Sequence, residues 1–370
     1  MKEKKPPQKD EVKIGATTGS LATAAALSSL LKITKNKDID TVEIQTPTTK
    51  LNINIKNVKQ INENKAQSTC TKHPYSDPDV TVGLEIKATV ELKNKNKNKQ
   101  EKIIITGGKG VGIITKPGLQ IPIGEHAINP VPRKMITENL EKHIPENKIA
   151  IVTISIPKGE EIANKTMNPR LGIKNGISIL GTTGIAKAMD EQAYQNSIVK
   201  QIDIAKAEKI EELIFVPGNI GEKLALKKLN IKKEQIIQTG NYIGFMFEEA
   251  EKRNIKKFTF FGHIGKLVKV AGGIFNTKHA IADGRCEIFA AHSALIGCDK
   301  KTIQQIFNAK TTEEIISILE KKEIHIEVLN SIADAIKIKC QDKFNLELNV
   351  IFVDMEGNIL NTNYNDKLIK

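Results

Sequence analysis

Three similar stretches decide the fold of the second half of the chain: it reads LIFVPGNIG at residues 213–221, IIQTGNYIG at 236–244 and FTFFGHIG at 258–265. Each is an apolar run that ends in a glycine-containing turn, and the first two lead into helix-like sequence. Strands that alternate with helices pair in parallel, because the crossover helix returns the chain to the same end of the sheet. We therefore predict strands at 213–217, 236–239 and 258–261 in one Rossmann-like α/β domain.

The turns after these strands are the first candidate binding site. In a parallel sheet, ligands bind outside the carboxyl ends of the strands. The turn residues that we expect at this edge are Gly218, Asn219, Gly240, Asn241, Gly262 and Gly265. Each turn alone is equally typical of an ordinary tight connection, and none has the spacing of a dinucleotide-binding or phosphate-binding loop.

The first half of the chain has a different pattern. An Ala/Leu-rich run at 21–31 predicts a buried helix, and alternating apolar residues at 51–55 and 82–92 predict half-buried strands. The prediction is an α+β domain with a mixed or antiparallel sheet. The domain boundaries follow as a flexible tail at 1–12, the α+β domain at 13–200, the Rossmann-like domain at 201–310, and C-terminal helices with a hairpin at 311–370.

A long Gly/Pro-rich stretch at 106–135 is the most unusual feature of this half. It holds six glycines and four prolines among apolar residues, between a strand-like and a helix-like run. Loops this long are either functional or disordered, and the apolar residues argue against disorder. We expect its glycines to line an apolar cleft for a ligand, although a surface crossover has the same composition. The GATTGS segment at 15–20 is either a helix cap or an anion site.

Composition restricts the class of partner. The formal charge of +13 over 370 residues favours anionic partners. The lysines are scattered and aromatic residues make up only 4%, which is a poor supply of stacking surfaces for nucleic acid. Four widely spaced cysteines form no metal motif, and no secretory signal or membrane-spanning run is visible. These features predict a cytoplasmic protein with no metal site, no membrane partner and no nucleic-acid partner.

Arginine is rare in this lysine-rich chain, so the four arginines are informative. The planar guanidinium grips a carboxylate or phosphate with two parallel bonds, which lysine cannot do. Arg133 and Arg170 lie in Gly/Pro/Asn-rich segments, and Arg285 follows Asp283 and Gly284. We predict that these three arginines hold acidic groups, whereas Arg253 ends a helix-like run and has the position of a favourable C-terminal charge.

Polar residues recur in the apolar region at 279–292. If Asp283 starts a helix, Glu287 lies on the same face one turn later. An internal ion pair and a contact with a ligand are equally good interpretations of this cluster.

Seven sequence motifs, distributed along most of the chain, together resemble those of the cobalt-precorrin-5B C(1)-methyltransferase family, CbiD. They are TKPGL at 115–119, NPVPR at 129–133, NPRLG at 168–172, the run at 176–184, GN at 240–241, GHIGK at 262–266 and the region at 279–292. The family usually has TGYTTGTC near the N-terminus, whereas this chain has Ala16, Ser20 and Leu21 in place of the tyrosine, the second threonine and the cysteine. A catalytic cysteine at that position is therefore excluded, unless Cys70 substitutes for it.

The resemblance implies a reaction, and it implies two domains that are not built like the common tetrapyrrole methylases. It implies transfer of a methyl group from S-adenosyl-L-methionine to C-1 of cobalt-precorrin-5B, which gives cobalt-precorrin-6A in anaerobic cobalamin biosynthesis. Cobalt would enter only as part of the substrate, and other cobalamin-pathway enzymes are possible hand-over partners. The alternatives are a tetrapyrrole carrier without catalysis or a nucleic-acid-binding protein.

With this reaction in view, the candidate residues take roles. The ring is rich in carboxylates, for which Lys116, Arg133, Arg170 and Arg285 are the candidate ligands. The turn residues named above would hold the methyl donor. His263 is the candidate proton acceptor, although a histidine beside a turn is more often a structural hydrogen-bonder. Asp283 or Asp79 would face the amino or hydroxyl groups of the donor.

Overall fold

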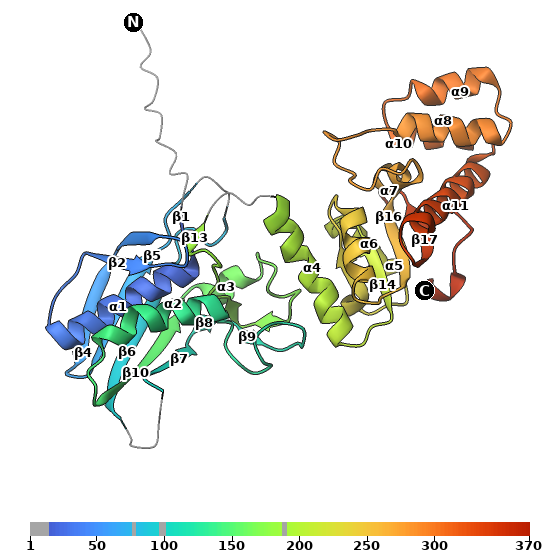
Figure 1. Cartoon of the computed structure of the whole chain (residues 1–370). Coiled ribbons are helices and arrows are strands. Elements are labelled where there is room, and N and C mark those ends of the chain that lie inside the picture. The colour runs from blue at the N-terminus through green and yellow to red at the C-terminus, as the bar shows by residue number, and fades with distance from the viewer. Residues whose placement is uncertain (1–14, 76–78, 96–100, 187–190) are drawn as a thin grey trace, which may run out of the picture. The chain divides into compact units, whose positions relative to one another are not determined.

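The computed structural model describes residues 15–75, 79–95, 101–186 and 191–370. The expected flexible tail at 1–12 lies outside these residues. The chain divides into two compact units, 1–190 and 191–370. Both units mix helices and strands (Figure 1). No helix in the described part of the chain is both long and apolar enough to cross a bilayer.

The first unit contains three α-helices and thirteen strands among its described residues. The helices are α1 (Thr18–Lys35), α2 (Pro130–Leu140), which continues into the 3-10 helix η1 (Glu141–His143), and α3 (Gly159–Ala163). The strands are β1 (Gly15–Ala16), β2 (Thr41–Gln45), β3 (Lys50–Asn54), β4 (Asn57–Asn62), β5 (Lys65–Thr71), β6 (Glu85–Asn94), β7 (Ile103–Gly107), β8 (Gly110–Val111), β9 (Ile113–Ile114), β10 (Lys148–Ser155), β11 (Ile173–Lys174), β12 (Gly176–Ile177) and β13 (Ile185–Ala186).

A mixed sheet forms the centre of the first unit, as predicted. Its strand order is β4-β5-β6-β10-β7, and every pair is antiparallel except β10 with β7. Helices α1 and α2 cover one face of this sheet (Figure 1). Alternate residues of β6 and β10 are buried beneath α1, whose residues 18–30 are all buried.

Helix α1 has clear start and stop signals. The hydroxyl of Thr17 accepts a hydrogen bond from the Ser20 amide at 3.1 Å, which is a standard N-cap. Asn36 ends the helix in the left-handed conformation at φ 48°, and its amide donates to the Lys32 carbonyl. The predicted helix at 21–31 is therefore confirmed, with longer ends.

The second unit contains eight α-helices and four strands. The helices are α4 (Glu191–Ala207), α5 (Asn219–Lys228), α6 (Ile243–Glu251), α7 (Ile264–Ala271), α8 (Arg285–Leu295), α9 (Lys300–Phe307), α10 (Thr312–Glu320) and α11 (His325–Lys343), with short 3-10 helices η2 (Lys233–Gln235) and η3 (Asp366–Leu368). The strands are β14 (Glu212–Val216), β15 (Ile236–Gln238), β16 (Lys257–His263) and β17 (Glu347–Val353).

These four strands form one parallel sheet in the order β15-β14-β16-β17. The three predicted strands are confirmed. The fourth was expected as one arm of a C-terminal hairpin and instead pairs with β16 in parallel, with only a single antiparallel bridge between Val353 and Ile359. The region after residue 299 holds the three α-helices α9, α10 and α11, in agreement with the expected C-terminal helices.

Both faces of this sheet are covered, which explains why its strands are nearly continuous apolar runs. Phe215, Phe258 and Phe260 point into the larger core with Phe247 of α6, and the Phe215 and Phe247 rings stack with centroids 4.9 Å apart. Ile214 and Phe261 face the opposite side, toward α5 and the C-terminal segment. Full burial of each such side chain contributes about 1.5–3 kcal/mol.

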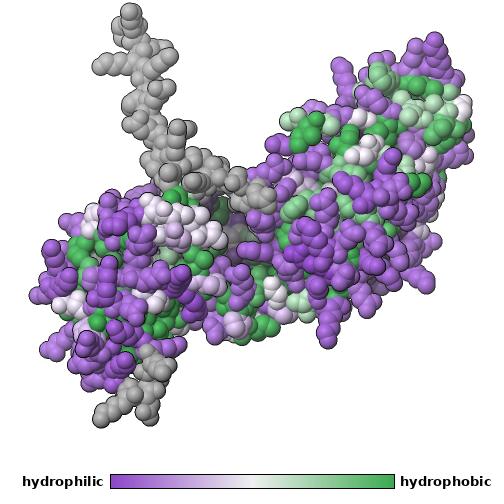
Figure 2. Space-filling view, in the orientation of Figure 1, coloured by the Kyte–Doolittle hydropathy of each residue, from purple (hydrophilic) through white to green (hydrophobic). Residues whose placement is uncertain are grey.

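The surface is largely hydrophilic on the face shown in Figure 2, as the scattered lysines predict.

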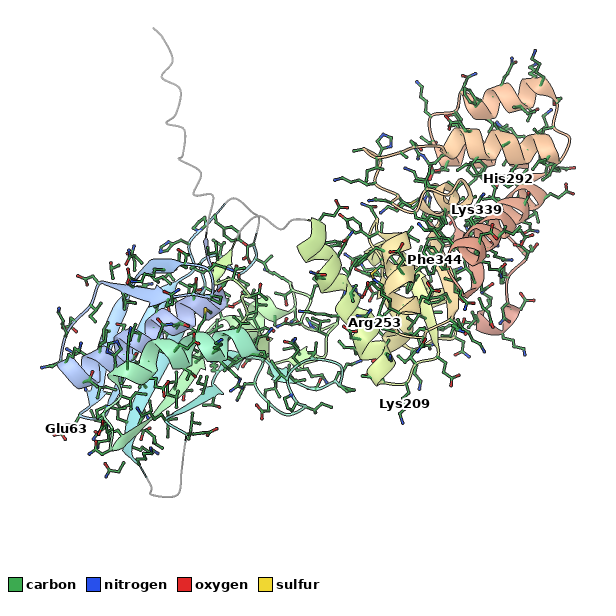
Figure 3. The ribbon with its side chains drawn as sticks, viewed as in Figure 1. Glu63, Lys209, Arg253, His292, Lys339 and Phe344 are labelled. Carbon is green, nitrogen blue, oxygen red and sulfur yellow. The ribbon has the colours of Figure 1, made fainter. Side chains whose placement is uncertain are left out.

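Arg253 (Figure 3) follows α6 and pairs with Asp203 of α4 at 2.6 Å and with Glu249 at 2.7 Å. It therefore joins two helices.

Candidate functional site

The turns that follow β14, β15 and β16 lie at one edge of the second unit's sheet, because these strands are parallel. Gly218 caps α5 in an extended conformation, and a Cβ atom there would meet no atom within 4 Å. Gly240 has φ +60°, which favours glycine. Gly262 is needed for packing, because its Cβ would lie 2.8 Å from Pro217 Cδ. The expected meeting of three strand ends at one edge is confirmed, although the third has no separate turn because β16 ends at His263 and α7 begins at Ile264. The binding role of these residues stays a prediction.

A cavity of about 510 Å³ opens beside this edge. Its lining comes from the turn after β15, from α7 and from the segment that leads into α8, and consists of Asn241, Gly265, Lys266, Lys269, Thr277, His279 and Arg285. Three of these residues were predicted from the sequence, namely Asn241, Gly265 and Arg285. The other candidate turn residues and His263 are not part of the lining.

Lysines 266 and 269 give the cavity its positive character. The Lys269 side chain is only 5% exposed, and its ammonium donates to the Ala282 carbonyl at 2.9 Å and lies 3.8 Å from Asp283. Lys266 has an exposed stem and an ammonium that faces the cavity wall, where it donates to the Asn241 side-chain oxygen at 3.1 Å. Loss of surrounding water and the charge of Lys269 lower the pKa of Lys266.

Asp283 is the anion that organises this group. Its two oxygens accept from Arg285 Nε at 2.8 Å and Nη2 at 2.7 Å, and His279 Nδ1 lies 3.2 Å away. Hydrogen bonds from Arg285 lower the pKa of Asp283 to about 2. Helix α8 begins at Arg285, so Asp283 lies just before the helix instead of starting it. The internal ion pair, one of the two interpretations of this cluster, is present.

His263 is a structural residue in this arrangement. It ends β16 and caps α7, with Nδ1 accepting a hydrogen bond from the Gly265 amide at 3.2 Å. Its Nε2 lies 3.0 Å from Glu313 Oε1, although this contact lacks hydrogen-bond geometry. The two candidate catalytic residues, His263 and Asp283, therefore contact different groups.

In the first unit, two predicted substrate residues lie on neighbouring segments. The Thr115 amide donates to the Gly172 carbonyl at 2.8 Å, and the stem of Lys116 covers Gly172. This pairing brings the segment of Lys116 beside that of Arg170. Both side chains are partly exposed.

Arg133 is more strongly committed to the fold. Its Nε donates to the Ile128 carbonyl at 2.9 Å and its Nη1 to the Ile105 carbonyl at 3.0 Å, while Nη2 lies 3.4 Å from Glu125. These bonds tie α2 to the preceding loop and to β7. Arg133 therefore has fewer N–H groups left for a substrate than the sequence suggested.

The glycines of the 106–135 stretch mostly face their own chain. A Cβ atom at Gly107 would meet the His126 ring, one at Gly108 would meet the Ser155 side chain, and one at Gly110 would meet the Ile156 carbonyl. Gly110 and Gly176 also lie in the paired strands β8 and β12, and Gly159 approaches Gly110 from α3. The expectation that these glycines line a ligand cleft was wrong at these positions, because they allow backbone segments to approach each other.

Two other features of the first unit are also structural. Amides at the start of α1 are satisfied within the protein, since Gly19 donates to the Leu180 carbonyl and Ser20 to Thr17. The cap is therefore confirmed for the 15–20 segment. Cys70 is fully buried, and burial raises the pKa of its thiol to about 12, so it does not supply a nucleophilic thiolate.

Three residues of the cavity lining were missed by sequence reasoning, namely Lys266, Lys269 and Thr277, whereas His279 belongs to the polar cluster that the sequence indicated at 279–292. Lys266 lies in the GHIGK motif, but a lysine among 56 basic residues carries no individual signal. Among the residues with described positions, no group of three or more His, Cys, Asp or Glu side chains is arranged to hold a metal ion.

The second unit is an α/β domain with a cationic cavity beside the carboxyl edge of its parallel sheet, and ligands of such sheets commonly bind at that edge. The chain belongs to the CbiD family. The family model described as CbiD matches residues 5–188, and the model described as CbiD, C-terminal domain, matches residues 276–364.

Curated relatives carry one name, cobalt-precorrin-5B C(1)-methyltransferase. The relative from Methanobrevibacter smithii is 60% identical over 95% of this chain and 97% of its own length. Those from Methanosphaera stadtmanae and Methanocaldococcus jannaschii are 49% and 45% identical, over 94% of this chain and 91% and 95% of their own lengths. A crystal structure of cobalamin biosynthesis protein (cbiD) from Archaeoglobus fulgidus is 26% identical, covers 73% of this chain and 83% of its own, and has a TM-score of 0.38.

Proposed function

We propose that this protein is a cobalt-precorrin-5B C(1)-methyltransferase, which methylates C-1 of its substrate to give cobalt-precorrin-6A in cobalamin biosynthesis. The observation that carries this proposal is the 60% identity over 95% of the chain to a relative of that name. The methyl donor in the proposal is S-adenosyl-L-methionine, which supplies an electrophilic methyl group on a sulfonium centre.

The donor is placed at the strand-end edge of the second unit. The sheet is Rossmann-like in this proposal, since strand order reverses between β14 and β16, and ligands bind at such a switch point. Open space beside Gly218 suits a bound nucleoside, and Glu222, a carboxylate only 6% exposed, contacts Gln238 next to it. The residues assigned to the donor are Gly218, Asn219, Gly240 and Gly262, with Asn241 and Gly265 at the border of the cavity.

The remaining assignments concern the substrate's carboxylates. Lys116, Arg170 and Arg285 are assigned to them, and Arg133 adds the N–H groups that its structural bonds leave. Each charge-assisted hydrogen bond contributes about 1.5–3 kcal/mol. In methyl transfer, the protein aligns the two reactants and excludes water. In well-oriented systems, these effects lower the activation barrier by about 7–11 kcal/mol.

Asp283 and His263 take different parts in the proposal. A carboxylate with a pKa of about 2 is a weak base and is never a proton donor near neutral pH, so Asp283 orients Arg285. His263 is the candidate proton acceptor, and it can take this part only when Nδ1 releases the Gly265 amide, because a neutral ring that accepts at Nδ1 carries its proton on Nε2. A cytoplasmic location belongs to the same proposal, supported by four cysteines that are all free thiols.

Calorimetry separates this enzyme from a carrier. We expect the full-length protein to bind S-adenosylhomocysteine, the demethylated form of the donor, with saturable one-site heat. A carrier would bind a carboxylated tetrapyrrole such as uroporphyrin but give no heat with S-adenosylhomocysteine, and that pattern would refute the methyltransferase proposal.

A further inference from the structure

The cavity beside α7 carries an excess of positive charge. Lys266, Lys269 and Arg285 line it, and Asp283 is the acid that contacts two of them. Together these two lysines, one arginine and one aspartate have two more positive than negative charges. Like charges held this close destabilise each other, and a bound anion relieves that repulsion.

The two lysines differ in how they are used. The ammonium of Lys269 is buried and directed at the carbonyls of Ala282 and Thr277, which fixes the segment before α8. An ammonium has three N–H bonds. Among the described residues, the Asn241 side-chain oxygen is the hydrogen-bond acceptor that contacts Lys266, so two of its N–H bonds remain for a ligand.

The Arg285 side chain is fixed by one carboxylate and keeps N–H groups that are available to a ligand. Arg285 Nε and Nη2 donate to the two carboxylate oxygens of Asp283, and this bidentate pair fixes the guanidinium plane. Within the described part of the chain, no acceptor contacts its Nη1. A charged side chain fixed by one carboxylate and exposed to a cavity is suited to hold a second carboxylate.

We propose that this cavity recognises a carboxylate of a ligand, with Lys266 Nζ and Arg285 Nη1 as the donors. The inference rests on the proposed function, which offers two sources of that group: an acidic arm of the tetrapyrrole and the amino-acid end of the methyl donor. Charge favours the tetrapyrrole, because S-adenosylmethionine carries a net positive charge that the cavity repels. A cavity of about 510 Å³ has room for one acidic side chain of the tetrapyrrole ring.

The test compares full-length Lys266→Gln with the parent by calorimetry. The probes are uroporphyrin, which carries eight carboxylates, S-adenosylhomocysteine, which carries one, and 5′-methylthioadenosine, which carries none. Lys339→Gln is the matched control. Lys339 is exposed on α11 (Figure 3) and is not a lining residue, so its substitution removes the same charge outside the cavity. Lys266→Arg keeps the charge.

We expect Lys266→Gln to weaken uroporphyrin binding about tenfold or more, while Lys266→Arg and Lys339→Gln stay within about threefold of the parent. A loss confined to S-adenosylhomocysteine, with 5′-methylthioadenosine unaffected, would support the carboxylate site and assign it to the donor. Equal affinities of Lys266→Gln and Lys339→Gln for both carboxylated probes would overturn the inference alone. A parent protein that binds neither probe would overturn the proposed function as well.

Discussion

Charged side chains in this protein fall into two groups according to how many protein partners they have. Lys72, Lys269 and Arg133 each donate two or more hydrogen bonds to carbonyl, carboxylate or hydroxyl oxygens and are largely buried or partly covered. Lys266 makes one such contact and borders a cavity. The number of hydrogen bonds that a charged side chain makes within the protein therefore distinguishes structural residues from candidate ligand-binding residues, which residue type alone does not.

The pair of Lys72 and Asp79 allows a test of a structural charge. Burial alone would raise the pKa of Asp79, but hydrogen bonds from Lys72 at 2.6 Å and from Thr81 lower it to about 2. Because the folded pKa lies below the ordinary value, this carboxylate stabilises the fold above about pH 4, and the contribution is lost as the pH falls toward 2.

We expect Asp79→Asn to lower the free energy of unfolding at pH 7 by about 1.5–3 kcal/mol and to flatten its decline between pH 4.5 and pH 2.5, as measured by urea titration. Asp342→Asn, at an exposed carboxylate on α11, should leave that decline unchanged. Parallel curves for Asp79→Asn and the parent protein would show that the buried pair does not govern acid stability.

At the residue scale, sequence reasoning singled out residues of a rare type, whereas the ligand contacts expected of them stay predictions. The four arginines stood out, and Arg285 does line the cavity. Lys266 and Lys269 were missed because lysine is everywhere in this chain, and their difference from other lysines arises from neighbours that the sequence does not place beside them. Asp283 was identified as a candidate, but its bidentate bond to Arg285 depends on the helix start at Arg285.

At the scale of elements, glycines were recognised but their purpose was misjudged. Gly159 lies in α3, and a Cβ atom there would collide with the Gly110 carbonyl. The neighbouring segments are held together by the pairing of Gly176 with Gly110 in β12 and β8. Composition shows that a backbone can approach something closely, but the approaching partner is set by the fold.

We expect Gly159→Ala to destabilise the protein by about 1–3 kcal/mol or more, because two backbones would have to separate. Gly124→Ala is the control for loss of glycine alone, since its Cβ would meet nothing within 4 Å and its φ of +88° costs only local strain. Thermal and urea unfolding of both variants measures the difference. A cost for Gly159→Ala no greater than that for Gly124→Ala would contradict the packing role.

Strand prediction was accurate where strand and turn occurred together. β14, β15 and β16 each precede a glycine turn, and their boundaries differ from the predicted ones by one or two residues. β17 has the same apolar character but follows five helices after β16, so its pairing with β16 could not be inferred from local pattern. Strand order is a property of tertiary packing and left no sequence signal.

At the scale of the whole molecule, two compact units each have their own hydrophobic core. Family models match residues in both units, and relatives of one name align with about 95% of the chain. The motifs that carried the resemblance are distributed over both units, which is why they were sufficient to indicate the family. They did not reveal which side chains are saturated by protein partners, because those partners come together only in the folded chain.

The decisive measurement is the fate of a labelled methyl group. The protein should be incubated with cobalt-precorrin-5B and S-adenosyl-L-methionine labelled with ¹³C at the methyl carbon, and the product examined by NMR. We expect one label per ring, bonded to C-1, with one S-adenosylhomocysteine formed for each product. A label at another carbon, or no transfer by protein that binds both compounds, would show that the chain is not a C-1 methyltransferase.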